Sequence, residues 1–473
     1  MLAIENSSSS EPRPHPDPGL RRSAICRDHG RREEDGGVQE TPLSVVPSLV
    51  PPQSSVLSSH HPHLSTSSKG RMVTLESLLL SDTSRASRRA APHPLIFRLI
   101  SWAIDTIVTI SSIVRIPLLS VAYVFNPTPF PGWSFNRLVQ IRTERFRGTL
   151  LSWVLPTILF DERRKENWDL YTEEEKEGRV KIDVLEIPPV DARWTGGFAS
   201  LGEVKAETRP AFLICPLSGG RAGKDRADGS RIILHLHGGG YIRGHPLWTP
   251  FPYNIARATG LDCLSVCYRK TLSPSSSFPA PLFDALSAYS HLTQTLHYAP
   301  SSILLLGESA GGHLSLLLSQ YLHQLGLPQP GCIALSSPWS DWSPSYPSYA
   351  ENEPYDSVCM PRLRGAVLSA TRYFEREALK SPWFSPSKAS PGHWTYLQQE
   401  GVGVYLQYGG REAMRDEVAV LGERMKRDGV RVRVREDVNG VHTSALTDGG
   451  ARKMFEKDLV EMLSDGNGAE DRA

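Results

Sequence analysis

Short runs of apolar and β-branched residues recur along the chain from about residue 130 onward. Between several of them, as at residues 281–296 and 313–325, apolar positions return with the spacing of a helix that covers a sheet. Strands that alternate with helices and are joined by glycine-rich turns predict an α/β fold, with a mostly parallel twisted sheet and helices on both faces. The expected strands are residues 180–187, 211–215, 232–236, 261–268, 303–306, 332–336 and 402–408.

Residues 95–125 form the first strongly apolar stretch. Arg98, Asp105 and Arg115 interrupt it, and each charge at the centre of a bilayer costs about 2.5–3.5 kcal/mol on insertion scales. Charged and hydroxyl side chains share one narrow stripe of the helical wheel, which predicts an amphipathic helix with a wide apolar face that ends before Pro117. Such a helix either lies in a membrane interface or docks on the folded body; a membrane span is the least favoured alternative.

The N-terminal region, residues 1–92, has a different composition. Its first 70 residues contain 28 Ser, Pro or Gly, and no aromatic residue precedes Phe97. Such a segment cannot bury enough apolar surface to offset its conformational entropy, so we expect it to be disordered. It begins without the basic flank and apolar run of a secretory signal. An alternative interpretation is that translation starts at Met72.

Charge and cysteine content exclude several classes of protein. The 473 residues include 52 Lys and Arg against 51 Asp and Glu, and this net charge of +1 disfavours a nucleic-acid partner. The six cysteines are too scattered for a disulfide-stapled secreted protein. Cys263 and Cys267 lack a second pair at zinc spacing, so we interpret them as small core residues and expect no metal. The sequence therefore favours an intracellular protein with one large folded body.

The segment around Ser309 carries the clearest chemical signal. An apolar strand leads into Gly307-Glu308-Ser309-Ala310-Gly311, and an apolar helix follows. This is the context of the Gly-x-Ser-x-Gly nucleophile elbow, in which the serine sits on a strained turn and the glycines keep side chains away from nearby backbone. The sequence therefore predicts Ser309 as a nucleophile, with Gly307 and Gly311 as supporting residues.

A second motif, His237-Gly238-Gly239-Gly240, ends an apolar strand about seventy residues earlier. Consecutive glycines leave backbone N–H groups free to bind the oxyanion of an acyl-transfer transition state. We expect these donors to be Gly239 and Gly240, with the N–H of Ala310 as the third. His237 and the neighbouring His235 have no metal partners nearby in the sequence, so both are interpreted as structural.

Serine chemistry also requires a base and an acid, which follow the nucleophile in the order acid, then histidine. His442 lies in a glycine-containing loop after the basic strand expected at 430–435, and it alone has both the order and the loop setting of the base. Three carboxylates are candidates for the acid. Glu412, directly after a strand end, is favoured, and Asp416 and Asp437 remain as alternatives.

With these elements together, the chain resembles the hormone-sensitive-lipase-like group of α/β-hydrolase esterases. The resemblance covers roughly residues 130–463 and rests on several motifs. In that group the triad acid, usually Asp, falls on the position of Glu412, and Asp is commoner than Glu at position 308. The matching segments are residues 237–240 (His-Gly-Gly-Gly), 268–269 (Tyr-Arg), 278–280 (Phe-Pro-Ala), 307–312 (Gly-Glu-Ser-Ala-Gly-Gly), 337–341 and 381–386, and 412–417.

The resemblance implies a serine esterase that acts on a small-molecule ester without a metal or organic cofactor. It also implies a helical cap over the serine, formed by residues 130–165 and 342–396. Some members of the group are held at the endoplasmic reticulum by an N-terminal apolar segment, which residues 95–125 would match. Seven large residues of the cap are candidates either for lining the substrate pocket or for forming the core of the cap: Trp153, Leu155, Trp342, Tyr346, Tyr355, Tyr373 and Phe374.

Other functions remain open from the sequence. An amide or formamide substrate would use the same mechanism. A non-hydrolytic small-ligand receptor on the same fold is the main rival, and the presence of His442 argues against it because the gibberellin receptor, which resembles this family, has lost that histidine. A membrane-tethered scaffold is a third alternative. The sequence does not determine the acyl chain length or the oligomeric state.

Overall fold

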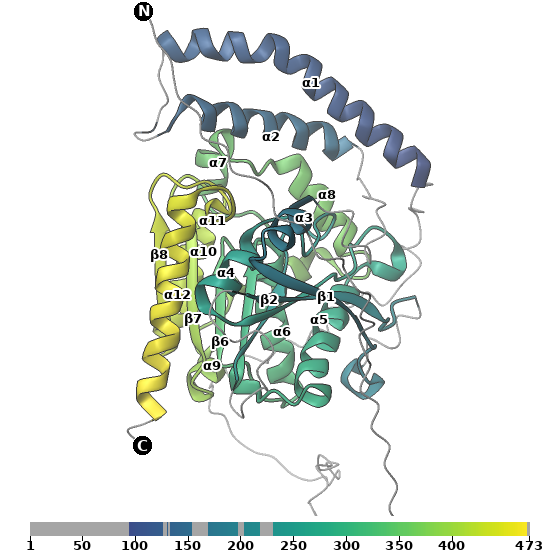
Figure 1. The fold of residues 1–473 in the computed structure, drawn as a ribbon, viewed down its shortest axis with the longest axis vertical. Coiled ribbons are helices and arrows are strands. Elements are labelled where there is room, and N and C mark those ends of the chain that lie inside the picture. Colours follow the sequence, from purple (N-terminus) through teal and green to yellow (C-terminus); the bar gives the residue numbers. More distant parts are fainter. Residues whose placement is uncertain are drawn as a thin grey trace, which may run out of the picture. The chain divides into compact units, whose positions relative to one another are not determined.

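The computed structural model describes residues 94–125, 130, 133–153, 169–196, 203–217 and 230–470. The expectation of disorder for residues 1–92 falls outside these residues. One sheet of eight strands has the order β1-β2-β4-β3-β5-β6-β7-β8 (Figure 1). The two pairings β1–β2 and β2–β4 are antiparallel and all others are parallel. The strands are β1 Val180–Ile187, β2 Arg209–Pro216, β3 Ile232–Leu236, β4 Asp262–Val266, β5 Ile303–Glu308, β6 Cys332–Ser336, β7 Gly403–Gly409 and β8 Arg431–Asp437.

Helices cover both faces of the sheet because the central strands are apolar on both sides. Along β5, Ile303 and Leu305 pack into one core with α5, α6 and α10. Leu304 and Leu306 alternate with them and pack into a second core with α4 and α12. The predicted α/β architecture is thus confirmed. The helices are α1 Pro94–Phe125, α2 Phe135–Trp153, α3 Asp169–Lys176, α4 Phe251–Thr259, α5 Ala280–Ser290, α6 Ala310–Gln324, α7 Ser348–Asn352, α8 Met360–Ala370, α9 Thr395–Gln399, α10 Arg415–Arg427, α11 Ser444–Thr447 and α12 Gly449–Glu470.

Helix α1 does not end before Pro117, as the sequence had suggested, but continues to Phe125. Proline removes one backbone donor and crowds the preceding turn, but the helix passes through Pro117 in spite of this cost. Within the described part of the chain, the segment Trp102–Phe125 is the one helical stretch that is long and apolar enough to cross a membrane.

Helix α1 contacts α2 on one side and exposes many apolar residues elsewhere. Arg115 donates to the carbonyl of Arg142 at 3.1 Å and stacks over the ring of Phe146. The apolar Ile104 and Val108 are buried. The exposed large apolar residues of α1 are Leu99, Trp102, Ile107, Ile110, Ile113, Val114, Ile116, Leu118, Val121, Val124 and Phe125.

Helix α2 connects α1 to the insertion that follows β6. Arg145 donates to the carbonyls of Glu353, Asp356 and Val358 and pairs with the Glu353 carboxylate at 3.1 Å. At its other end, just before α2, Trp133 Nε1 donates to the carbonyl of Asn439 at 2.9 Å. The segments expected to form a cap therefore contact both the insertion and the loop before His442.

Candidate active site

Ser309 lies at the sharp turn between β5 and α6, with φ 53° and ψ −118°. The glycines of its motif are required by close packing. A Cβ on Gly307 would lie 2.5 Å from the carbonyl oxygen of Gly311, and one on Gly311 would lie 1.8 Å from that of Leu236. The spacing seen in the sequence therefore results from a turn that only glycine allows at these two positions.

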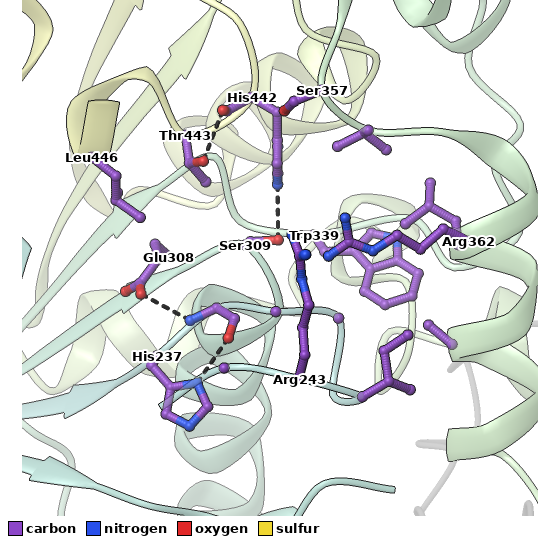
Figure 2. Close-up of a pocket in the computed structure, with 18 of the residues that line it drawn as sticks. His237, Arg243, Glu308, Ser309, Trp339, Ser357, Arg362, His442, Thr443 and Leu446 are labelled. Atoms are coloured by element: carbon purple, nitrogen blue, oxygen red, sulfur yellow. Dashed lines mark hydrogen bonds between the residues drawn. The ribbon is translucent and has the colours of Figure 1, made fainter. Parts of the chain in front are cut away.

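His442 faces this serine from the loop between β8 and α11. Its Nε2 lies 2.8 Å from Ser309 Oγ, as Figure 2 shows, and its side chain is 9% exposed. The two residues are 133 positions apart in the chain, and β6, β7 and β8 separate them in sequence. This is the distance at which a histidine can accept the proton of a hydroxyl nucleophile.

Of the three carboxylates considered, Glu412 is the one whose side chain faces the His442 ring. Its Oε2 lies 3.7 Å from His442 Nδ1, beyond the usual hydrogen-bond distance of about 2.7–3.2 Å. The same oxygen accepts a hydrogen bond from Ser337 Oγ at 2.6 Å. The alternatives are engaged elsewhere: Asp416 pairs with Arg415 at 2.8 Å, and Asp437 accepts from Ser444 Oγ at 2.8 Å.

The glycine loop, residues 238–240, lies beside Ser309. Two of its residues have positive φ angles, which favour glycine over residues with a side chain. Gly239 has φ 119° and Gly240 has φ 63°, and a Cβ on Gly239 would lie 2.2 Å from the carbonyl oxygen of Arg243. Both glycines line the same cavity as Ser309 and His442. Ala310, buried at the first position of α6, follows the serine directly.

The buried carboxylate of Glu308 forms a hydrogen bond with this loop. Glu308 Oε1 accepts a hydrogen bond from the N–H of Gly238 at 2.8 Å, and its Oε2 lies 2.9 Å from His235 Nε2. The other ring nitrogen of His235 lies 2.6 Å from Ser265 Oγ. The side chain of Glu308, the residue before Ser309, thus contacts the glycine loop and His235.

His237 packs its ring on that of Tyr268, with the centroids 4.3 Å apart and the planes 12° apart. Burial lowers its pKa well below the ordinary value, so the ring is neutral and Nδ1–H donates to the carbonyl of Gly238 at 2.7 Å. These contacts agree with structural roles for His235 and His237.

A cavity of about 220 Å³ opens in front of Ser309 (Figure 2). Its wall includes Trp339, Met414 and Leu363, the last from α8 of the insertion. The described residues among the pocket-lining candidates are not part of this wall. Trp342, Tyr373 and Phe374 are buried in the core, Tyr346 packs against that core, and Tyr355 packs on Phe130; the side chains of Trp153 and Leu155 lie outside the described residues.

Comparison with known families matches residues 233–446 to the α/β hydrolase fold. This segment holds all of β3 but its first residue, together with the glycine loop, the Ser309 turn and the His442 loop. The chain therefore has the α/β-hydrolase fold. The match confirms the fold and the family resemblance predicted from the sequence.

Several relatives of this chain are named as esterases or carboxylesterases. Esterase LipI of Mycobacterium tuberculosis is 27% identical over 215 residues, which cover 45% of this chain and 64% of LipI. Carboxylesterase NlhH of the same organism is 30% identical over 26% of this chain and 40% of its own length. A thermostable esterase from Pseudomonas putida shares the fold, with a TM-score of 0.51 and 14% identity over 70% of this chain and 96% of that one. The chain spans less than two thirds of the curated relatives it matches first.

Two positioning residues escaped the sequence analysis. Asp356, fully buried, accepts hydrogen bonds from the N–H groups of His442 at 3.0 Å and Ala413 at 2.7 Å. Burial raises the pKa of this carboxyl group. Ser337 donates to Glu412 and accepts from the N–H of Thr443 at 3.0 Å. No local pattern marks Asp356, whereas Ser337 lies in a segment that the family resemblance had singled out.

No group of three or more His, Cys, Asp or Glu side chains that could hold a metal ion occurs in the described part of the chain. Cys263 and Cys267 are buried free thiols in the core beneath β4 and α4.

Proposed function

We propose that this α/β-hydrolase is a serine carboxylic-ester hydrolase. The observation that carries the proposal is the 2.8 Å separation of His442 Nε2 and Ser309 Oγ beside a loop of two glycines with positive φ. The esterase names of its relatives support the same reaction class. The substrate that fits a small, largely apolar cavity is a small to medium ester with an apolar acyl group.

In the first half of the reaction, Ser309 Oγ attacks the ester carbonyl while His442 Nε2 takes the hydroxyl proton. The carbonyl oxygen becomes an oxyanion, and the N–H groups of Gly239, Gly240 and Ala310 donate to it. Removing one such donor costs about 2.7–4 kcal/mol of transition-state stabilisation in enzymes of this type. The tetrahedral intermediate then expels the alcohol, which receives the proton from His442 and leaves an acyl-serine.

In the second half, water replaces the alcohol. His442 accepts a proton from the water as its oxygen attacks the acyl carbonyl, and the proton then returns to Ser309 as the acid leaves. Glu412 stabilises the imidazolium and holds its tautomer. Its 3.7 Å separation from Nδ1 has to shorten for a direct hydrogen bond, and we expect this to happen when the ring becomes charged.

Hydrolysis of p-nitrophenyl esters of increasing acyl length tests the proposal. We expect turnover by the purified chain, loss of turnover in Ser309→Ala, and wild-type rates in the matched control Ser464→Ala, because Ser464 lies exposed on α12. A folded protein that hydrolyses none of these esters contradicts the proposal. An esterase and an amide hydrolase would both form an acyl group on Ser309. Adding a formamide and an anilide to the same panel therefore distinguishes them by which class of substrate is hydrolysed faster.

We also propose that α1 lies in a membrane interface. A helix that contacts α2 on one side and exposes eleven large apolar side chains on the rest of its surface is what we expect of an interfacial anchor. Flotation with neutral phospholipid vesicles should carry the whole chain upward, and replacing Ile110 and Ile113 on the exposed face by Lys should abolish flotation. Equal flotation of the variant would show that α1 does not bind the lipid.

A further inference from the structure

The acid of the proposed triad forms its hydrogen bond with a serine and not with the histidine. Ser337 Oγ lies 2.6 Å from Glu412 Oε2, whereas His442 Nδ1 lies 3.7 Å from the same oxygen. Within the described part of the chain, His442 Nδ1 and the second carboxylate oxygen, Glu412 Oε1, are buried without a hydrogen-bond partner. The two side chains that are expected to pair are therefore held just beyond hydrogen-bond distance.

The hydroxyl hydrogen of Ser337 is directed to Glu412. The backbone N–H of Thr443, the residue after His442, donates to Ser337 Oγ at 3.0 Å, so the hydroxyl is the acceptor in that contact. An ionised carboxylate only accepts hydrogen bonds, so the hydroxyl is the donor to Glu412. This hydrogen bond offsets part of the negative charge that Glu412 would otherwise direct at the imidazole ring.

The backbone at Ser337 is held by its neighbours. Ser337 is 1% exposed and has φ 46°, a conformation that residues with a side chain rarely adopt. Its N–H donates to the carbonyl of Gln407 at 2.6 Å, and the flanking Ser336 and Trp339 form main-chain hydrogen bonds with Ser309 at 3.0 and 2.9 Å. One short segment after β6 thus contacts the nucleophile, the acid and the residue next to the base, and its contacts keep the strained serine in place.

We propose that Ser337 is a positioning residue that holds Glu412 away from His442 in the resting enzyme. This inference rests on the proposed esterase function and concerns the same site. While the serine holds Glu412, the imidazole ring stays neutral, and able to accept the Ser309 proton, down to a lower pH. When the ring takes up that proton, its charge attracts the carboxylate. The hydrogen bond between Glu412 and His442 then stabilises the transition state more than the resting state.

A substitution at Ser337 leaves the other ionisable groups around the pair in place. Asp356 of the insertion interacts electrostatically with His442 and Glu412, and Tyr408 of β7 interacts with Glu412. Further ionisable groups line the cavity together with His442: Glu144, His237, Arg243, His245, Glu308 and Arg362. Because all of these are present in wild type and variant alike, a change in pH dependence can be assigned to the bond between Ser337 and Glu412.

The pH profile of kcat/KM for a neutral p-nitrophenyl ester tests the proposal. Its acidic limb reports the proton that His442 must lose before it can act as the base. In Ser337→Ala the carboxylate of Glu412 can bond to Nδ1 in the resting enzyme and stabilise the charged ring. The acidic limb should therefore move to higher pH, by about one unit.

Three further variants separate the hydroxyl from other effects. Ser385→Ala removes another buried hydroxyl that bridges a backbone N–H, that of Trp342 at 2.9 Å, and a carboxylate, that of Asp341 at 3.2 Å, and its acidic limb should stay in place. Ser337→Gly removes the same hydroxyl as Ser337→Ala and suits the positive φ, so it replaces the alanine variant if that does not fold. In the Glu412→Gln background, Ser337→Ala should move the limb no further, because the charged partner is already absent.

An acidic limb that stays in place without the Ser337 hydroxyl, or that moves to lower pH, would overturn the proposal and leave Ser337 a purely structural residue. The same movement in Ser385→Ala, or in the Glu412→Gln background, would also overturn it, because the effect would not depend on the bond between Ser337 and Glu412. Failure of the esterase function is a different result, namely no ester hydrolysis by the wild-type protein at any pH.

Discussion

The carboxylate of Asp356 accepts a hydrogen bond from the main-chain N–H of His442 at 3.0 Å, and its other oxygen accepts one from Ala413 at 2.7 Å. A single buried side chain thus joins the loop of the proposed base to the residue after Glu412. Arg145 of α2 in turn donates to the carbonyls of Asp356 and Val358 at 3.0 and 3.2 Å. Helix α2 is therefore linked to the proposed catalytic residues through the backbone of the insertion.

Asp356→Asn should lower kcat with little change in KM. An amide accepts from one of the two N–H groups and directs its own NH₂ at the other, which leaves a buried donor without a partner and costs about 1–3 kcal/mol of stability. Steady-state kinetics and urea denaturation measure the two effects. Asp428→Asn is the matched control, because Asp428 bridges the N–H groups of Gly392 and Trp394 in the same way, away from Ser309. Equal kcat losses in both variants would mean that Asp356 acts only through stability.

Glu412→Gln should reduce kcat by about 10³-fold or more, because an amide can hold the wrong histidine tautomer and cannot stabilise the imidazolium. Asp416→Asn should retain most activity, since Asp416 pairs with Arg415 and caps the N–H of Ser348 at 2.9 Å. Pre-steady-state release of p-nitrophenol measures the acylation step directly. If the two variants had reversed effects, the acid would be Asp416.

Gly239→Ala should reduce kcat by about 10²–10³-fold, the effect of losing one oxyanion donor. The added Cβ would meet the carbonyl of Arg243 at 2.2 Å, so the loop has to move. Gly178→Ala controls for the strain of a positive φ alone, since Gly178 has φ 63° and no atom within 4 Å of the added Cβ. A Gly239→Ala variant with wild-type kcat would exclude this amide from the oxyanion hole.

The buried His313 should make the protein less stable in acid. Its Nε2–H donates to the carbonyl of Trp383 and its Nδ1 accepts from Tyr241, so the neutral ring is satisfied, and burial lowers its pKa to about 3. Above pH 6.5 neither the folded nor the unfolded ring is charged. As the pH falls below that value only the unfolded ring gains a proton, which removes about 1.4 kcal/mol of stability per pH unit until the folded pKa is reached.

Urea denaturation of the wild-type protein and of His313→Gln at several pH values between 7.5 and 5 measures this effect, since those values span the upper part of the window between about 3 and 6.5. The wild-type free energy of unfolding should fall more steeply with decreasing pH than that of the variant. Parallel slopes would show that His313 does not titrate on unfolding.

Much of the fold and the main candidate residues could be predicted from the sequence, because the signals are local. The alternation of apolar runs and helical patterns follows the period of each element, and the glycines around Ser309 are fixed by backbone contacts as close as 1.8 Å. His442 was found through chain order and its glycine turn. The structure brings its Nε2 within 2.8 Å of the serine.

The features that the sequence analysis missed depend on tertiary contacts. Asp356 accepts hydrogen bonds from backbone N–H groups 57 and 86 positions away in the chain. Every residue but proline has such an N–H group, so the sequence does not mark these partners. Trp342 was a pocket-lining candidate because it is aromatic, but its side chain is 1% exposed and packs against Trp339 and Phe384. The residue type alone does not distinguish a pocket-lining tryptophan from a core tryptophan. Arg243 and Arg362 become neighbours of one cavity only when the insertion folds back over the glycine loop.

Covalent labelling with a fluorophosphonate, followed by mass spectrometry of the labelled peptide, tests the central claim most directly. The account predicts one phosphonyl group on Ser309, and His442→Ala should slow the labelling by several orders of magnitude because the hydroxyl then lacks its base. A folded protein that remains unlabelled, or that is labelled at another serine at the same rate with and without His442, would contradict it.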